Sequence, residues 1–226
     1  MSSTGTAITI IIVVGVLISL AYIVQSIENQ RQQKRARIQA IRNNIRNVER
    51  LYDTLPNRVI PEQLNHFISH HLHSQWKKIL LLDNNSSFQK AAQQSLQNSS
   101  EFSVDNTYPS GSLTLLSDQR EAQKTMTAAQ ELSQWLQMLK KSSPQSQTIN
   151  DLLSHLQYCH AQASIDRMLF DAIECEQTKG AKVSIPQYKN CLNSLDNMHY
   201  SQKNDRQVFE LNNHIEALSN PSVEED

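Results

Sequence analysis

An uninterrupted apolar segment near the N-terminus limits the possible folds of this chain more than any other part of its sequence. No charged side chain precedes Glu28, and residues 7–24 read AITIIIVVGVLISLAYIV. Eighteen helical residues extend about 27 Å, which is close to the hydrocarbon thickness of a bilayer. We therefore predict a transmembrane helix over residues 7–27, in which Tyr22 lies at the interface that suits an amphipathic ring.

A cleaved signal peptide is the alternative interpretation of this segment. Signal peptides have a positively charged start and a cleavage site of small residues. The first six residues, MSSTGT, contain no Lys or Arg, and the sequence AYIVQS at the end of the apolar run lacks an A-x-A pattern. The sequence therefore favours a retained span.

The cations of the chain are concentrated behind the predicted span. Residues 31–50 hold seven Lys and Arg against one acidic residue, whereas residues 51–226 hold 14 against 20. Because Lys and Arg next to a span stay in the cytoplasm, we expect residues 1–6 outside an inner (plasma) membrane and the C-terminal part inside. An odd number of cysteines without close spacing agrees with a reducing compartment. We expect them to be buried as small hydrophobic residues; they are Cys159, Cys175 and Cys191.

Residues 28–56 form a predicted basic stalk. Neither Gly nor Pro occurs between the span and Pro56, so the helix should continue without a break. Its apolar residues recur at alternating steps of three and four, which is a coiled-coil pattern. The residues of this seam are Ile38, Ile41, Ile45, Val48 and Tyr52.

Several roles for the stalk remain open. The cations can contact anionic lipid headgroups, the seam can join copies of the chain into a homo-oligomer, or the seam can pack on the protein's own following helices. In the simplest alternative the cations act only as a topology signal and the seam is ordinary core. Nucleic acid is not an expected partner, since no aromatic residue lies among the cations to stack on bases. The cations assigned to headgroup contact are Arg31, Lys34, Arg35, Arg37 and Arg42.

The remainder of the chain is expected to be all-α. Only 4 Gly and 6 Pro interrupt its 226 residues, and Leu, Gln, Ala and Lys favour helices. We predict a cytoplasmic domain of five to six helices over residues 57–220, with a loop at 98–113 and an acidic tail at 221–226. The predicted helices cover residues 61–82, 87–97, 118–141, 144–179, 184–198 and 203–219.

Local signals set the expected ends and faces of these helices. Ser117 is the predicted N-cap of helix 118–141, and Gly180 the residue that ends helix 144–179. Ser184 and Gln187 match a capping box that would begin the next helix. The apolar face of helix 144–179 shifts by half a turn near Ser164, so either the helix bends there or its halves bury different faces.

Three histidines are the candidates for metal binding. His66, His70 and His73 lie at i, i+4 and i+7 on one helix face, and two histidines at i, i+4 can bind zinc. Lys77 shares this face and repels a cation, so we expect a solvated polar face and assign no metal. Asp166 and Glu176, with the other acidic residues of helix 144–179, are likewise expected on a solvated surface.

The chain lacks the sequence patterns of known catalytic and nucleotide sites. No phosphate-binding glycine loop, zinc-protease motif or nucleophile elbow occurs. We therefore expect no cofactor and no catalytic residue. The predicted function is that of a non-enzymatic single-pass membrane protein whose cytoplasmic helical domain is an interaction or scaffold module, with membrane lipids and a second protein as partners, in an envelope-associated assembly.

Two alternatives to this function remain. One is a lipid-binding or self-associating stalk protein that acts through residues 31–55. The other is a metal or pH sensor built on the histidines.

Overall fold

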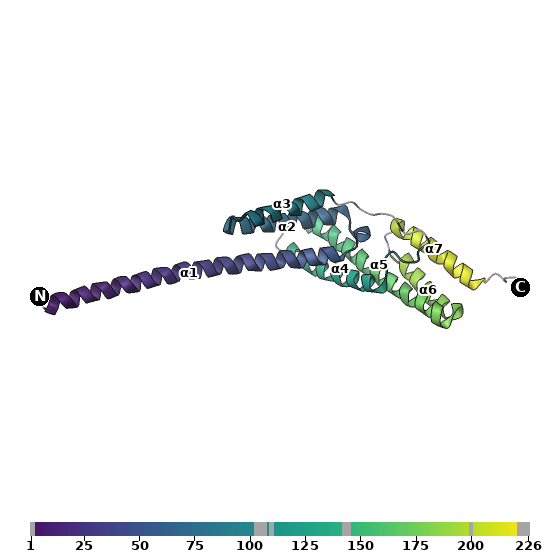
Figure 1. Ribbon diagram of the computed structural model, residues 1–226. Helices are drawn as coiled ribbons and strands as arrows, with labels where there is room; N and C mark the ends of the chain where they lie inside the picture. The colour runs from purple at the N-terminus through teal and green to yellow at the C-terminus, as the bar shows by residue number, and fades with distance from the viewer. Residues whose placement is uncertain (1–2, 102–107, 109–110, 142–145, 199–200, 221–226) are drawn as a thin grey trace. The chain divides into compact units, whose positions relative to one another are not determined.

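The computed structural model describes the backbone of residues 3–101, 108, 111–141, 146–198 and 201–220. Side chains are described within these ranges except at 3–14, 16–19, 98–101, 146 and 201–203. This described part of the chain contains seven α-helices and one short 3-10 helix, and no strand (Figure 1). The predicted all-α class is confirmed.

Helix α1 spans Ser3–Thr54 without interruption. Pro56 and a 3-10 turn, η1 (Asn57–Val59), follow it. The expectation that one helix runs from the apolar segment through the basic stalk is confirmed, because no residue in between breaks it. Where side chains are described, no helix has the length and apolar character needed to cross a bilayer. Most of residues 7–27 falls outside the described side chains, so the span stays a prediction.

Helices α2 and α3 span Glu62–Leu82 and Ser86–Glu101. Apolar residues of α2 that recur at helical spacing are buried, namely Leu64, Ile68, Leu72 and Ile79. The loop predicted at 98–113 is wrong at its start, because α3 continues through residue 101. Most of the other residues of that predicted loop, 102–107 and 109–110, lie outside the described residues.

Helix α4 spans Gln119–Lys140, and its N-cap is Asp118 rather than the predicted Ser117. Asp118 Oδ1 accepts the Glu121 N–H at 2.7 Å, and the Glu121 carboxylate accepts the Ser117 N–H at 2.6 Å. These reciprocal bonds resemble a capping box. The positive end of the helix dipole also stabilises a carboxylate, which explains why Asp118, and not the neighbouring Ser117, is the N-cap of α4.

Helix α5 spans Ser146–Lys179, and its apolar face shifts as predicted. Leu152 and Leu156 are buried on one side, and Leu169 and Ala172 on the other. One continuous helix therefore buries different faces along its two halves. Met168, which lies at helical spacing from Ile165 and Ala172, is exposed. The predicted start of this helix, at residues 144–145, lies outside the described residues.

Gly180 ends α5 and, at a φ of 83°, also serves as the N-cap of α6 (Ala181–Asp196). The predicted capping box at Ser184 is wrong. The Gly180 carbonyl already accepts the N–H groups of Val183 and Ser184, so the helix begins three residues earlier. The Ser184 hydroxyl instead donates to the Ala181 carbonyl at 3.1 Å. Helix α7 spans Ser201–Ser219.

The chain forms two compact units, each built from two stretches of sequence. The first comprises Met1–Arg46 and His70–Leu96, and the second Asn47–Ser69 and Gln97–Asp226. Within the second unit α4 packs on α5, α5 on α6, and α6 on α7 (Figure 1). All three cysteines are buried, as predicted. The core shared by α5, α6 and α7 contains Ile165, Leu169, Ala172, Tyr188, Cys191, Leu195, Leu211 and Ile215.

Candidate functional site

Three arginines of the first unit line one groove on helix α1. Arg35, Arg42 and Arg46 follow one another at i, i+7 and i+11 and therefore share a helix face. The groove has a volume of about 330 Å³, and its lining carries three positive charges and one negative charge. This excess of positive charge favours an anionic ligand. The other lining residues are Ile38, Gln39, Asn43 and Asp83.

Arg42 is held in position by an aromatic pair. Its guanidinium carbon lies 5.8 Å from the centroid of the Phe88 ring, a cation–π contact. Phe88 in turn stacks on Trp76, with ring centroids 6.1 Å apart. No carboxylate with a described position lies within ion-pair distance of Arg35, Arg42 or Arg46. The three guanidinium groups can therefore bind an external anion.

The cations predicted to contact lipid headgroups differ in exposure. Arg31, Lys34, Arg35 and Arg37 are exposed, whereas Arg42 is half-buried. The structure thus brings Arg35 and Arg42 into the groove and leaves the other three on the open surface of α1. Their contact with lipid stays a prediction.

The predicted self-association seam is partly covered by the protein itself. Ile45 and Val48 are buried, and Ile38, Ile41 and Tyr52 are half-buried. This burial within a single chain favours the alternative in which the seam packs on the protein's own residues. Self-association through the seam stays a prediction.

Tyr52, at the end of the seam, belongs to the second unit and is hydrogen-bonded within it. Its hydroxyl donates to Asn65 Oδ1 at 2.8 Å. Burial, aided by the charge of Asp53, raises the pKa of Tyr52 to about 12. The phenol therefore stays protonated and keeps donating this hydrogen bond at any physiological pH.

The three histidines of α2 have different surroundings. His66 and His70 are exposed, and His66 Nε2 lies 3.5 Å from Glu62. His73 is half-buried, and its Nδ1–H donates to the Ala92 carbonyl at 2.8 Å. Within the described residues, no three or more His, Cys, Asp or Glu side chains are arranged to hold a metal ion.

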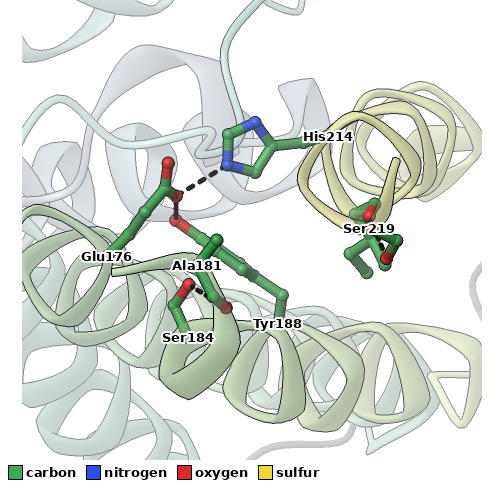
Figure 2. Close-up of polar contacts among 7 residues, drawn as sticks. Glu176, Ala181, Ser184, Tyr188, His214 and Ser219 are labelled. Carbon is green, nitrogen blue, oxygen red and sulfur yellow. Dashed lines mark hydrogen bonds and ion pairs between the residues drawn. The ribbon is translucent and has the colours of Figure 1, made fainter. Parts of the chain in front are cut away.

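A polar cluster joins three helices of the second unit at Glu176 (Figure 2). Tyr188 of α6 donates to Glu176 Oε2 at 2.6 Å, and His214 Nε2–H of α7 donates to the same oxygen at 2.8 Å. The two rings meet edge to face, with centroids 5.0 Å apart. Burial acts to raise the pKa of Glu176, but these two hydrogen bonds and the charge of His214 outweigh it and lower the pKa. An ionised carboxylate therefore links α5, α6 and α7.

Asp166 was expected on a solvated surface and is fully buried, which corrects that prediction. Its Oδ2 accepts the Leu116 N–H at 2.7 Å, and its Oδ1 accepts from Gln207 at 2.9 Å and from Gln162 at 3.0 Å. Burial raises the pKa of Asp166 to about 6, although these hydrogen bonds act in the opposite direction. The network ties α7 and the segment before α4 to α5.

The network continues along one face of α5. Tyr158 lies eight residues before Asp166, and its hydroxyl donates to Asn204 Oδ1 of α7 at 2.8 Å. Gln207 also donates to the Leu113 carbonyl at 2.9 Å. The residues Tyr158, Gln162 and Asp166 recur at steps of four, which is the sequence signal that could have located this polar face.

Both polar clusters of the second unit use their hydrogen bonds to hold helices together. The groove on α1 instead presents three guanidinium groups that have no carboxylate within ion-pair distance in the described part of the chain, so it is the candidate functional site. Comparisons of the chain with protein-family models, with curated proteins and with solved structures found no match.

Proposed function

We propose that this protein is a non-enzymatic, membrane-tethered interaction module. The apolar part of α1 holds it in a membrane, and its other helices lie on the cytoplasmic side. The observation that supports this proposal is a run of exposed apolar side chains on α1 directly before its cations. Leu20, Ile23 and Val24 are 53%, 53% and 66% exposed. Full burial of such a side chain contributes about 1.5–3 kcal/mol.

The distribution of these side chains around α1 favours lipid over a partner helix. At about 100° per residue, Leu20 and Ile23 lie about 60° apart on one face of α1, whereas Tyr22 lies about 160° from Leu20, on the opposite side. A soluble partner helix would cover a single stripe, whereas a helix that is apolar on all sides suits a lipid environment. The cations that follow support the orientation, because Lys and Arg next to a span stay in the cytoplasm.

A membrane tether lowers the binding affinity that the remaining helices need in order to associate with a partner. Holding a binding surface at a membrane raises its effective concentration toward other membrane-bound partners. Weak contacts at the groove of α1 would then suffice for association. An envelope-associated assembly is the setting that this proposal implies.

Flotation of cell membranes tests the tether. The full chain should float with lipid and resist alkaline extraction. Gly15 lies near the middle of the predicted span, and a Cβ added there meets no other atom within 4 Å. Gly15→Arg should therefore weaken insertion by about 2.5–3.5 kcal/mol, and Gly15→Leu is its matched control. If the unmodified chain stays in the soluble fraction, the proposal fails.

A reporter fused to the C-terminus tests the orientation. A reporter that is active only outside the cytoplasm should be inactive in this fusion, because the cations behind the span hold that end inside. Activity of the reporter would place the helical units on the wrong side for this proposal.

Exposed cations close behind the apolar run favour a second candidate function, which is binding of anionic lipid by the stalk. Each such cation contributes about 1 kcal/mol near an anionic surface. Replacing Arg31, Lys34, Arg35 and Arg37 by Gln should abolish binding of residues 28–226 to anionic vesicles at low salt. Unchanged binding would exclude this candidate.

A further inference from the structure

We infer that the groove lined by Arg35, Arg42 and Arg46 docks an acidic helical segment of another protein. This inference rests on the proposed function, since it names the partner class of the membrane-tethered module. It starts from three guanidinium groups that lie on one helix face without a carboxylate partner among the described residues. Arginine pairs with carboxylates through two parallel hydrogen bonds, which makes such groups suited to an acidic ligand.

The spacing of the arginines selects a helix rather than an extended strand. Along the axis of α1, Arg35 and Arg42 are about 10.5 Å apart, and Arg42 and Arg46 about 6 Å apart. An antiparallel helix with Glu at positions j, j+4 and j+11 has the same two spacings. Same-face residues of a strand recur about every 6.6–6.8 Å, which fits the shorter spacing but not the longer one.

The groove also specifies an apolar contact and a polar one. Ile38 lies between Arg35 and Arg42, where it can pack against an apolar residue at j+8 of the docked helix. Asp83 adds one carboxylate and favours a hydrogen-bond donor on the ligand. The contact of Arg42 with Phe88 limits its motion before the ligand arrives, so less side-chain entropy is lost on binding.

Distance from the membrane argues against a bilayer lipid as the ligand. Helix α1 is continuous, so Arg42 lies about 27 Å along the axis beyond Val24, and Arg46 about 33 Å. A helix tilt of 40° still leaves Arg42 about 20 Å from the hydrocarbon. The headgroup layer extends roughly 5–7 Å, and screening at physiological salt acts over about 8 Å. Headgroups therefore do not reach the inner part of the groove.

A second copy of the chain does not supply the ligand. No helix of this sequence carries Asp or Glu at j, j+4 and j+11. The three acidic residues at the C-terminus are consecutive and cannot reproduce the spacing either. The printed sequence therefore contains no segment that matches the groove, and a separate protein is the occupant that we infer.

The test measures peptide binding to the full chain in phosphatidylcholine nanodiscs by fluorescence anisotropy. The probe is a labelled alanine-rich helical peptide with Glu at j, j+4 and j+11 and Leu at j+8. A second peptide of the same composition distributes its glutamates around the helix. We expect the first peptide to bind at least about fivefold more tightly, and its affinity to fall about tenfold as salt rises from 50 to 300 mM.

Charge-matched variants locate the binding site. Asn43 lines the groove and Asn44 does not, and both are exposed, so Asn43→Glu and Asn44→Glu place the same charge on different faces. Arg42→Gln has Arg37→Gln as its control. We expect Asn43→Glu and Arg42→Gln to weaken binding about five- to tenfold, and both controls to change it less than about twofold. Circular dichroism establishes that each variant remains helical.

Three results would overturn the inference. They are equal binding of the two peptides, equal effects of the two Asn variants, and tight binding of the chain to nanodiscs of anionic lipid when neither peptide binds. The flotation result separates this failure from that of the proposed function. If the chain floats but the peptide does not bind, the docking inference alone fails. If the peptide binds but the chain does not float, the tether fails and the groove still docks its ligand.

Discussion

The buried Asp166 should make the stability of the second unit depend on pH in an unusual direction. Its carboxylate is completely buried, and no cation with a described side chain lies within ion-pair distance of it. Ionising it inside the protein is therefore costly, even though three N–H groups donate to it. Burial raises its pKa from 3.8 to about 6.

The pKa difference fixes both the sign and the size of the effect. Above pH 6 the carboxylate is ionised in the folded and the unfolded chain, and the folded state carries the full cost of burial. As the pH falls from about 6 to about 4, the folded state takes up the proton first, so stability rises. A pKa of about 6 in place of 3.8 corresponds to a total gain of about 3 kcal/mol in the free energy of unfolding, which is complete below both pKa values.

Urea unfolding of the full chain in detergent measures this effect in the second unit. The chain has two tryptophans, and Trp76→Phe leaves Trp135 of α4 as the reporter. The free energy of unfolding should rise between pH 7.5 and pH 5, relative to the same chain carrying Asp166→Asn, by about 1.4 kcal/mol. Asparagine cannot ionise, so it removes this site's pH dependence.

Burial also raises the pKa of Asp53 in the second unit, but Asp53 is present in both chains, so its contribution cancels from the comparison. Two further shifted groups act outside this measurement. Glu176 has a lowered pKa, so its stabilising contribution is lost only below pH 4.5. Burial lowers the pKa of His71, which lies in the first unit. A difference between the two chains that stays constant from pH 7.5 to pH 5 would refute the account of Asp166.

Four further substitutions test the local structure by urea unfolding. Gly180→Ala should cost about 1–2 kcal/mol, because the added Cβ meets no atom within 4 Å and only the φ of 83° is strained; an unchanged midpoint would contradict this. Asp118→Ala should cost about 1 kcal/mol and Ser117→Ala much less, since Asp118 is the N-cap of α4; the reverse order would restore the sequence-based assignment. Tyr188→Phe should cost about 1–2 kcal/mol through the lost bond to Glu176, and an unaltered stability would mean that this bond contributes nothing.

The positions and buried faces of the helices could be predicted because the determining signals are local. The apolar residues of α4 and α5 recur at helical spacing, and Leu132, Leu136 and Leu152 are buried, as that spacing indicates. The half-turn shift within α5 was also visible, since it depends only on residues of one helix. Errors at helix starts arose where two capping signals competed within a few residues, as at Asp118 and Gly180.

The polar network around Asp166 was not predicted, because its partners are far apart in the sequence. Leu116 lies 50 residues from Asp166, and Gln207 lies 41 residues away on α7. An aspartate on a helix is solvated by default, and only the packing of α7 and the segment before α4 onto α5 buries it.

The candidate groove combines both kinds of information. The stripe of arginines on α1 is a property of sequence spacing, since side chains at i, i+7 and i+11 share a face of any helix. The approach of Asp83 and the stacking of Phe88 against Arg42 required the fold, because these residues lie about 40 positions away in the chain. Helix periodicity is a short-range property that residues carry with them, whereas a binding site needs side chains from segments that only folding brings together.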